Sequence, residues 1–437
     1  MTLTSSVTLP TLIVGFLLGV AALGLVANEL GKRANLTIPS RLLLSGGLGM
    51  GVLAIGIKVV IMTVLSLTDT HAMAATGNAM RDTTKEFFTF SGDASDKLAV
   101  PANPSGFRAW RALPEKPHDP SGNRTTPEKV ALGRILFNDT NLSLARDLSC
   151  ASCHSLADGG DDNAPYSTGH LGQTGDRNAP TVYNAAFLSR LFWDGRASSL
   201  EDQAEGPFVN PVEMSMPTLS AVEERVKEDP RYGPLFDAAF ASESSITIRN
   251  ITRAIAAYER TLVTPDTPYD RFVKGEDEAL SQAALRGLVL FDKIGCRNCH
   301  VDPMFSAAGT EKPLGIYRAF PVFWDGNPYL DKYDLVLDER PGRFRVPSLR
   351  NVALTAPYFH NGSVSDLEEA IRVMAVSQLG RTLSDDPLAD IRIVAASVEG
   401  TIPGRNTDMF TNRAVSRQEV SDIAEFLRSL TAATLPD

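Results

Sequence analysis

Two short motifs built from cysteine and histidine hold the clearest chemistry in this chain. They read CASCH at residues 150–154 and CRNCH at residues 296–300. Two thiols separated by two residues can both bond to the vinyl groups of one porphyrin, and the histidine that follows can then bind the iron. This pattern is the attachment signature of a c-type haem. The predicted haem-binding residues are Cys150, Cys153, His154, Cys296, Cys299 and His300.

The cysteine count excludes other uses of these thiols. The chain has 437 residues and four cysteines, all of them in the two motifs. Four cysteines are too few for a disulfide scaffold of this length. A zinc site made of four thiolates leaves the histidine after each pair unexplained, and a thioredoxin-like dithiol needs a βαβ pattern that is not visible. The sequence therefore predicts two covalent c-type haems, which bacteria attach outside the cytoplasm.

A helical pattern leads into each motif. Residues 131–137 read ALGRILF and residues 284–291 read ALRGLVLF, so similar helices precede the two haem motifs. The motifs start 146 residues apart, which indicates a duplicated domain and not a solenoid. Strand-like alternation is scarce, which favours a mainly α fold with two cytochrome c-like haem domains in tandem. The predicted boundaries are 126–275 for the N-terminal haem domain and 276–437 for the C-terminal one.

Residues 1–70 predict a membrane anchor or a signal region. The stretches 9–27 and 42–67 are apolar apart from Lys58, and each is long enough to cross a bilayer core of about 30 Å as a helix. Basic residues within 32–41 should stay in the cytoplasm, which sends the rest of the chain outside. Alternatively, 42–67 is a secretory segment with the small-residue cleavage site Ala-Met-Ala at 72–74. These two alternatives export the chain, whereas a third, a buried core hairpin, does not. We expect a periplasmic protein anchored to the inner membrane.

Residues 71–125 and the net charge give less information about function. Residues 71–125 contain closely spaced prolines and no sustained periodic pattern, which predicts a Pro-rich linker. The formal net charge is −10, and a protein that binds nucleic acid needs clustered Lys and Arg to contact phosphates. We therefore expect no nucleic-acid partner.

Several longer sequence words carry a family resemblance. Between about residues 125 and 380 the chain contains SCASCH, RNAPTVYNAAF, FWDGR, LEDQAEGP, NPVEM, VPSLRNVALTAPYFHNGS and EEAIRVMAVSQLG. In these words the chain closely resembles the bacterial dihaem cytochrome c peroxidase family, which includes related dihaem oxidases that modify tryptophan residues of a partner protein. The resemblance does not reach the first hundred residues, roughly the predicted anchor and linker.

The resemblance implies roles that the residues alone leave open. It implies a peroxidatic N-terminal haem with His154 as proximal ligand and His170 as a removable distal ligand. It also implies that Glu213 is the acid/base residue, with Gln203 beside it, and that Trp193 lies between the two haems. Without the resemblance, His170 is as readily an ordinary loop histidine, Glu213 a surface carboxylate and Trp193 a core side chain.

The implied chemistry suits these residue types. Cleavage of hydrogen peroxide into water needs a proton moved from one oxygen to the other, and a pocket carboxylate such as Glu213 can accept and return it. The amide of Gln203 can stabilise the polarised O–O bond by hydrogen bonding.

The second haem needs a sixth ligand. Met374 lies on an apolar helical stripe that usually means core packing, in a helix that Ser365 and Glu368 are predicted to open as a capping box and Gly380 to close. The resemblance nevertheless selects Met374 as the axial ligand. A thioether ligand raises the haem potential relative to a second histidine, which suits an electron-accepting centre. Related tryptophan-modifying oxidases often carry tyrosine here, so methionine favours the peroxidase.

Further expectations concern calcium and the chain end. The resemblance implies that Asn178, Thr355 and Pro357 hold a calcium ion, partly through backbone oxygens. We expect His360 to be structural, holding its loop near the C-terminal haem, and not a ligand. The family has almost no residues between its last two helices, whereas this chain has an insert at residues 385–417. We predict that the insert is a surface loop, either on the face that binds the electron donor or on a homodimer interface.

Three functions from different classes follow from these expectations. The favoured one is a peroxidase that reduces hydrogen peroxide with electrons from a small cytochrome c or a cupredoxin. The second is a dihaem oxidase that modifies tryptophan residues of a partner protein. The third is a non-catalytic electron carrier, against which Glu213 and Gln203 argue because a carrier needs no proton-transfer pair.

Overall fold

The computed structural model describes residues 110–240, 246–309, 315–337, 340–385 and 414–437. They belong to one compact unit, Ala99–Asp437. Both predicted apolar segments and residues 386–413 of the predicted insert lie outside the described residues. Within the described ranges, no helix has the length and apolar character needed to cross a membrane.

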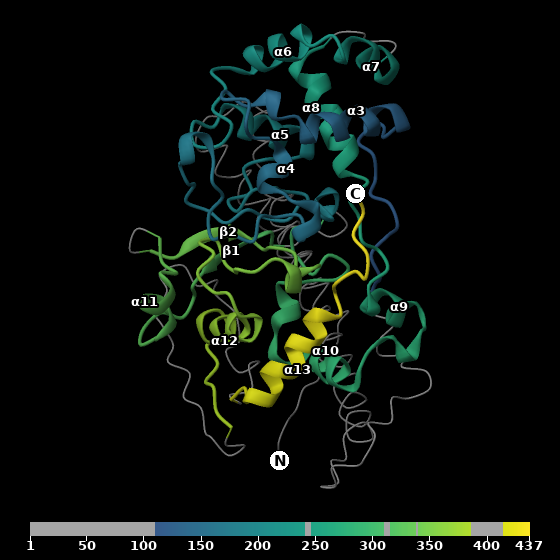
Figure 1. The fold of residues 1–437 in the computed structure, drawn as a ribbon. Helices are drawn as coiled ribbons and strands as arrows, with labels where there is room; N and C mark the ends of the chain where they lie inside the picture. The colour runs from purple at the N-terminus through teal and green to yellow at the C-terminus, as the bar shows by residue number, and fades with distance from the viewer. Residues whose placement is uncertain (1–109, 241–245, 310–314, 338–339, 386–413) are drawn as a thin grey trace, which may run out of the picture. The chain divides into compact units, whose positions relative to one another are not determined.

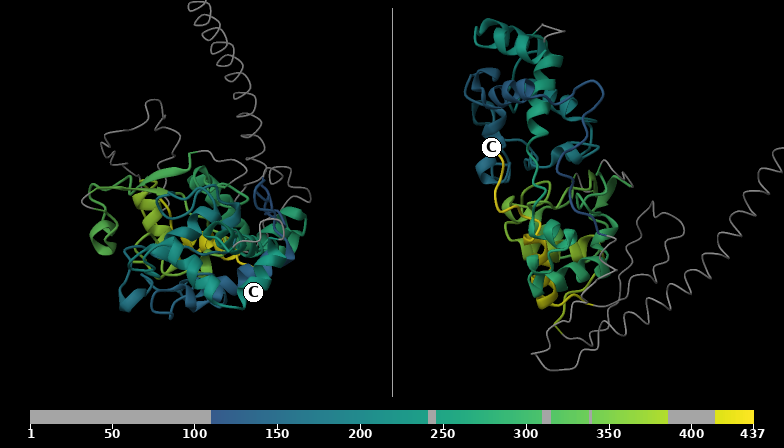
Figure 2. Two further views of the ribbon diagram at one scale, coloured as in Figure 1. Left: turned by 90° about the horizontal axis from the view of Figure 1, so that it is seen from above. Right: turned by 90° about the vertical axis from the view of Figure 1, so that its right-hand side faces the viewer.

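The described chain is mainly helical, as predicted, and its helices form an N-terminal and a C-terminal group (Figures 1 and 2). The N-terminal helices are α3 (Pro127–Asn138), α4 (Cys150–Cys153), α5 (Leu200–Val209), α6 (Leu219–Glu228), α7 (Tyr232–Ala239) and α8 (Ile248–Glu259). The C-terminal helices are α9 (Pro268–Lys274), α10 (Gln282–Ile294), α11 (Tyr329–Tyr333), α12 (Leu367–Ser377) and α13 (Arg417–Arg428). Short 3-10 turns lie at Thr140–Leu142, Leu156–Asp158, His170–Gly172, Ala185–Phe187, Asp277–Ala279, Cys296–Asn298 and Val352–Leu354.

The internal repeat seen in the sequence is also present in the helix packing. Helix α3 packs against α8, and α10 packs against α13. Each crossing uses a glycine, because a Cβ atom on Gly133 would lie 2.0 Å from the Ala254 carbonyl oxygen and one on Gly287 would lie 1.9 Å from that of Asp422. Only glycine allows the two backbones to come this close. Both glycines stand four residues before the phenylalanine that ends the repeated word.

Aromatic pairs complete the two crossings. Phe137 meets Tyr258 edge-on at 5.5 Å, and Phe291 meets Phe426 edge-on at 5.2 Å. Each pair lies in its own buried apolar cluster. The two groups of helices therefore have separate hydrophobic cores of similar construction.

Both ends of the described chain cross between the groups. Trp110 and Leu113, from the segment predicted as a linker, are 5% and 2% exposed, and Trp110 packs into the C-terminal core. In the opposite direction, the chain after α13 returns to the N-terminal group, where the Tyr183 hydroxyl donates to the Pro436 carbonyl at 2.8 Å (Figure 1). The linker prediction did not anticipate this packing, because isolated apolar residues among prolines have no periodicity.

A buried ion pair fixes the first of these crossings. Asp270 accepts hydrogen bonds from Arg350 Nη1 at 2.5 Å and Nη2 at 2.9 Å, and both side chains are fully buried. The same carboxylate accepts the backbone N–H of Leu113 at 2.8 Å. A single charged pair thus joins α9, the chain before α12 and the segment before α3.

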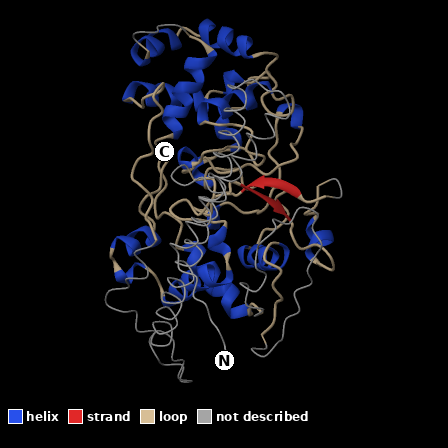
Figure 3. Ribbon diagram, turned by 180° about the vertical axis from the view of Figure 1, so that it is seen from behind, coloured by secondary structure: helices blue, strands red, loops and turns tan. Residues whose placement is uncertain are grey.

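Two features differ from the sequence prediction. Strands β1 (Tyr317–Phe320) and β2 (Gly342–Arg345) form a short antiparallel pair, shown in red in Figure 3. At the start of α12 the predicted capping box was wrong. The cap is Asp366, whose side chain accepts from the Glu369 N–H at 2.8 Å, because the helix begins at Leu367, one residue after the predicted start.

Candidate haem sites

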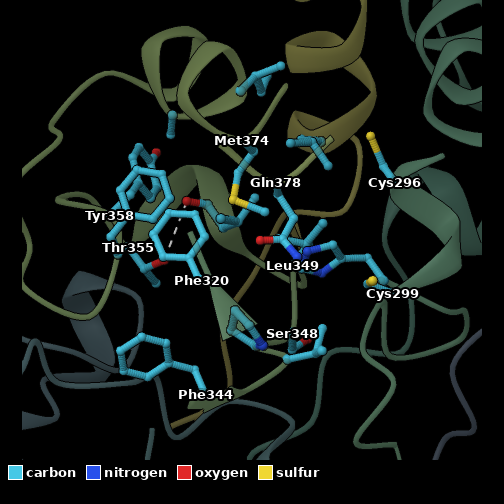
Figure 4. A pocket seen from close by; sticks show the side chains of 18 of the residues that line it. Cys296, Cys299, Phe320, Phe344, Ser348, Leu349, Thr355, Tyr358, Met374 and Gln378 are labelled. Atoms are coloured by element: carbon cyan, nitrogen blue, oxygen red, sulfur yellow. Dashed lines mark hydrogen bonds between the residues drawn. The ribbon is translucent and has the colours of Figure 1, made fainter. Parts of the chain in front are cut away.

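The cavity of the C-terminal group has a volume of about 260 Å³. Cys296, Cys299 and His300 line it from the end of α10 and the following turn, and Met374 lines it from α12. In Figure 4 the Met374 thioether points toward the middle of the cavity, while the two cysteines lie along one side. The structure therefore brings together the three residues of the second haem motif and Met374, which the resemblance selects as the sixth ligand of that haem.

Both motif histidines are held in the same way. His300 Nδ1 lies 3.1 Å from the Phe305 carbonyl oxygen, and His154 Nδ1 lies 3.2 Å from that of Gly160. Haem-ligating histidines commonly bond a carbonyl through one ring nitrogen and bind the iron through the other, which here would be Nε2. Burial lowers the pKa of both imidazoles, that of His300 to about 4, so each ring is neutral and can bind a metal.

The backbone of the two motifs is also alike. The His154 N–H donates to the Cys150 carbonyl and the His300 N–H to the Cys296 carbonyl, both at 2.9 Å. All four cysteines are half-buried, and none of them is in a disulfide. Each motif thus forms one tight turn that places two thiols and an imidazole together.

Buried polar atoms test whether the C-terminal cavity suits a haem. His360 Nε2 and Gln378 Oε1 are buried and make no hydrogen bond to any described residue, and both residues line the cavity. Buried polar groups normally have a partner. The cavity is apolar and contains two thiols, a neutral imidazole, a thioether and two buried polar atoms without hydrogen-bond partners among the described residues. These groups fit a c-type haem.

In the N-terminal group, the structure places His170 against Glu213. The backbone N–H of His170 donates to the Val212 carbonyl at 3.0 Å and to the Glu213 carbonyl at 2.9 Å. His170 Nδ1 is buried and has no hydrogen-bond partner among the described residues. The loop that carries the predicted removable ligand therefore lies directly on the loop that carries the predicted acid/base residue.

The Glu213 carboxyl is partly buried and held by one neighbour. Asn210, which ends α5, donates from Nδ2 to Glu213 Oε1 at 2.7 Å. Burial raises the pKa of Glu213, while the charge of Arg196 and the bond from Asn210 partly offset this shift. Gln203 is the fourth residue of α5, and the chain folds back over the end of that helix to reach Glu213.

The remaining predicted residues lie on the wall of the C-terminal cavity. Trp193, Asn178, Thr355 and Pro357 all line it. The Trp193 indole N–H donates to the Asn178 carbonyl at 2.8 Å, and the Trp193 carbonyl accepts the Arg345 N–H at 2.8 Å. Glu213, Gln203 and His170 are not among the residues that line this cavity, so the predicted residues form two separate groups.

The structure adds residues that the sequence did not single out. Asn210 orients Glu213, and Arg345 lies buried beside Trp193. Among the described residues, no three His, Cys, Asp or Glu side chains cluster to hold a metal ion. The predicted calcium ligands Asn178, Thr355 and Pro357 do not belong to these four residue types.

Comparison with known proteins places this geometry in a family. Residues 127–278 match the family described as di-haem cytochrome c peroxidase. The chain is 39% identical over 299 residues to the cytochrome c551 peroxidase of Pseudomonas aeruginosa, covering 67% of this chain and 85% of that protein. The chain belongs to the dihaem cytochrome c peroxidase family. It is also 37% identical over 309 residues to the methylamine utilization protein MauG of Methylorubrum extorquens, covering 69% of this chain and 82% of that protein.

Solved structures agree with this assignment. A MauG-like protein associated with microbial copper homeostasis aligns with a TM-score of 0.59 at 29% identity, covering 78% of this chain and 96% of that one. The diheme peroxidase BthA of Burkholderia thailandensis aligns with a TM-score of 0.55 at 24% identity, covering 74% and 93%, and shares the fold. The family assignment confirms the resemblance on which the predicted roles were based.

A buried carboxyl in the N-terminal core should make stability depend on pH. Glu259, at the end of α8, is 4% exposed, and burial raises its pKa from 4.5 to about 8. The folded state holds this proton more tightly than the unfolded chain, so its contribution is complete below pH 4.5 and is lost as the pH rises toward 8.

We expect Glu259→Gln to remove this part of the pH dependence. From pH 4.5 to pH 8, the free energy of unfolding of the parent should fall by at least about 1.4 kcal/mol more than that of the variant. A shift of one pKa unit corresponds to this free energy. Denaturant unfolding at both pH values measures the difference. Equal losses in the two proteins would contradict the prediction.

Proposed function

We propose that the protein is a dihaem peroxidase that catalyses H2O2 + 2e⁻ + 2H⁺ → 2 H2O with electrons from a small cytochrome c or a cupredoxin. The observation that carries the proposal is the partly buried Glu213 carboxyl, oriented by Asn210 and packed against the His170 loop. An electron carrier would not need a positioned carboxyl of this kind. The family membership of the chain supports the same reaction.

Haem, when bound, supplies redox-active iron at each of the two sites. Cys150, Cys153 and His154 would hold the N-terminal haem, and Cys296, Cys299, His300 and Met374 the C-terminal one. We propose the domain boundaries 126–275 and 276–437 for these two sites, which the separate hydrophobic cores support.

The proposed proton path runs through one carboxylate oxygen. Glu213 Oε1 accepts the bond from Asn210, whereas Oε2 makes no hydrogen bond to a described residue. In our proposal Oε2 takes a proton from one peroxide oxygen and returns it to the other, which leaves as water. Gln203 donates from its side-chain amide to stabilise the charge that develops on the departing oxygen. His170 must move away for peroxide to enter, and its loop would then shift against Glu213.

Electrons would enter at the C-terminal site and cross beside Trp193. The indole packs edge-on against Phe344 at 6.0 Å and donates to the Asn178 carbonyl at 2.8 Å, so two other residues of the cavity wall hold it. The proposed calcium ion would lie at Asn178, Thr355 and Pro357. In support, both carboxylate oxygens of the buried Asp161 have no hydrogen-bond partner among the described residues, and its loop packs against Leu354 and Thr355.

Replacing the thioether ligand should lower the potential of the electron-accepting haem. We expect Met374→His to reduce the midpoint potential of the C-terminal haem by on the order of 0.1 V, within the ~0.8 V range that axial ligands span. Spectroelectrochemical titration measures this change. Electron uptake from a cytochrome donor should slow as a result. An unchanged potential with both haems attached would exclude Met374 as the ligand.

For location and assembly we propose a periplasmic protein, anchored to the inner membrane by the segments 9–27 and 42–67. The alternative is a soluble periplasmic form released by cleavage after 72–74. Either form would present the insert 385–417 as a surface for the donor or for a second copy in a homodimer.

A second candidate is a dihaem oxidase that modifies tryptophan residues of a partner protein. The 37% identity to a protein named for methylamine utilization favours it, whereas Met374 in the cavity favours the peroxidase. The two are separated by mixing the protein with peroxide and a reduced small cytochrome c. Oxidation of roughly two cytochromes per peroxide, as the two-electron reaction requires, supports the peroxidase. Peroxide consumption without cytochrome oxidation overturns it.

A further inference from the structure

His360 has a fixed position and an unused hydrogen-bonding atom. The side chain is 1% exposed, and its Nε2 has no hydrogen-bond partner among the described residues. Its ring stacks on Phe344 at 4.5 Å and meets the Trp193 ring edge-on at 6.4 Å. The His360 carbonyl accepts the Asn178 N–H at 2.8 Å. Aromatic packing and backbone bonding therefore hold the imidazole in one place.

The position of His360 relative to the cysteines suggests its partner. Figure 4 places Cys296 and Cys299 on one side of the cavity, and Phe344, Thr355 and Tyr358 on the other. Because His360 stacks on Phe344 and lines the cavity, it belongs to the side away from the cysteines. The cysteines bond the vinyl groups of a c-type haem. The two propionates, its anionic groups, lie on the porphyrin edge away from those vinyl groups.

The two arginines on the wall already have partners. Arg318 donates from Nε to Cys299 Sγ at 3.3 Å and from Nη1 to the Tyr317 carbonyl at 2.9 Å. Arg345 donates from Nε to the Phe192 carbonyl at 3.0 Å. His360, in contrast, offers a buried ring nitrogen with no such contact. A carboxylate of the ligand would satisfy it.

We propose that His360 binds a propionate of the C-terminal haem by donating a hydrogen bond from Nε2–H. This inference rests on the two-haem site of the proposed function, but it does not require peroxidase turnover. It gives His360 a positioning role toward the haem beside Trp193, in place of the purely structural role that the sequence suggested. Donation to the propionate offsets its negative charge, which stabilises the ferrous state relative to the ferric state.

The test compares His360→Phe with His360→Gln in the full-length protein carrying both haems. Phenylalanine keeps an aromatic ring but has no donor, whereas glutamine keeps a donor. We expect His360→Phe to shift the ferric-to-ferrous equilibrium of the C-terminal haem about tenfold toward ferric, which is ~59 mV for one electron. The N-terminal haem should keep its potential. His360→Gln should retain most of the parent potential, and only the donor-free variant should move the propionate band in resonance Raman spectra.

Controls separate this role from packing. Phe320→Leu changes an apolar residue of the same wall and should shift the equilibrium less than about threefold. If His360→Phe does not mature with two haems, His360→Leu, which also lacks a donor, replaces it. An equilibrium and a propionate band like those of the parent in the donor-free variant would overturn the proposal. Equal shifts in the donor-free and glutamine variants would also overturn it. Loss of peroxidase turnover with the predicted shift intact would count only against the proposed reaction.

Discussion

Glu213→Gln should lower the turnover number for peroxide reduction by about 100- to 10,000-fold while both haems stay attached, because general acid–base catalysis contributes rate factors of that size. Glutamine keeps the shape of the side chain and can still bond Asn210, but it cannot accept a proton. Steady-state oxidation of a reduced cytochrome c by peroxide measures the change. Absorption spectra of the variant should show two intact haems.

A matched control makes the effect specific to the site. Glu224→Gln introduces the same chemical change at an exposed position on α6 and should leave turnover within about twofold of the parent, as surface substitutions have small effects. If Glu213→Gln turned over at the rate of Glu224→Gln, Glu213 would lose its proposed role in moving the proton.

Asp270→Ala should destabilise the protein by about 3–5 kcal/mol, since it leaves the fully buried Arg350 guanidinium without its counter-ion. The substitution also removes the acceptor of the Leu113 N–H, which ties the segment before α3 to the C-terminal core. Denaturant unfolding monitored by tryptophan fluorescence measures the loss. Trp110 lies in that core and should report it.

An exposed ion pair is the control for this prediction. Glu425 and Arg428 form a pair on α13 at 2.6 Å with side chains 43% and 45% exposed, and such pairs contribute about 0–1 kcal/mol. Glu425→Ala should therefore cost far less than Asp270→Ala. Similar losses in the two variants would show that burial of the Asp270–Arg350 pair is not what makes it important.

The sequence predicted those parts of the fold that depend on local pattern. The repeated helices before the two haem motifs appear as α3 and α10, and their glycines and phenylalanines mark the helix crossings. The short β1–β2 pair was not predicted, because strands of four residues give too little alternation to detect. The cap of α12 was placed one residue early because Ser365 and Asp366 are both good capping residues.

At the site, too, contacts between residues distant in sequence could not be predicted from local patterns. Local motifs identified both pairs of cysteines and their histidines, but a lone carboxylate or histidine has no pattern that reveals its partners. Asn210 orients Glu213 only because a turn after α5 brings them together. The unused nitrogen of His360 becomes visible only when Phe344 and Trp193, distant in sequence, pack around its ring.

The most direct test of the peroxidase assignment uses the half-reduced protein, with the C-terminal haem reduced and the N-terminal haem oxidised. Peroxide and a reduced small cytochrome c are added, and oxidation of the cytochrome is followed over time. We predict continuous turnover that stops when the peroxide is consumed. Absence of turnover in a protein whose two haems give normal spectra would contradict the assignment.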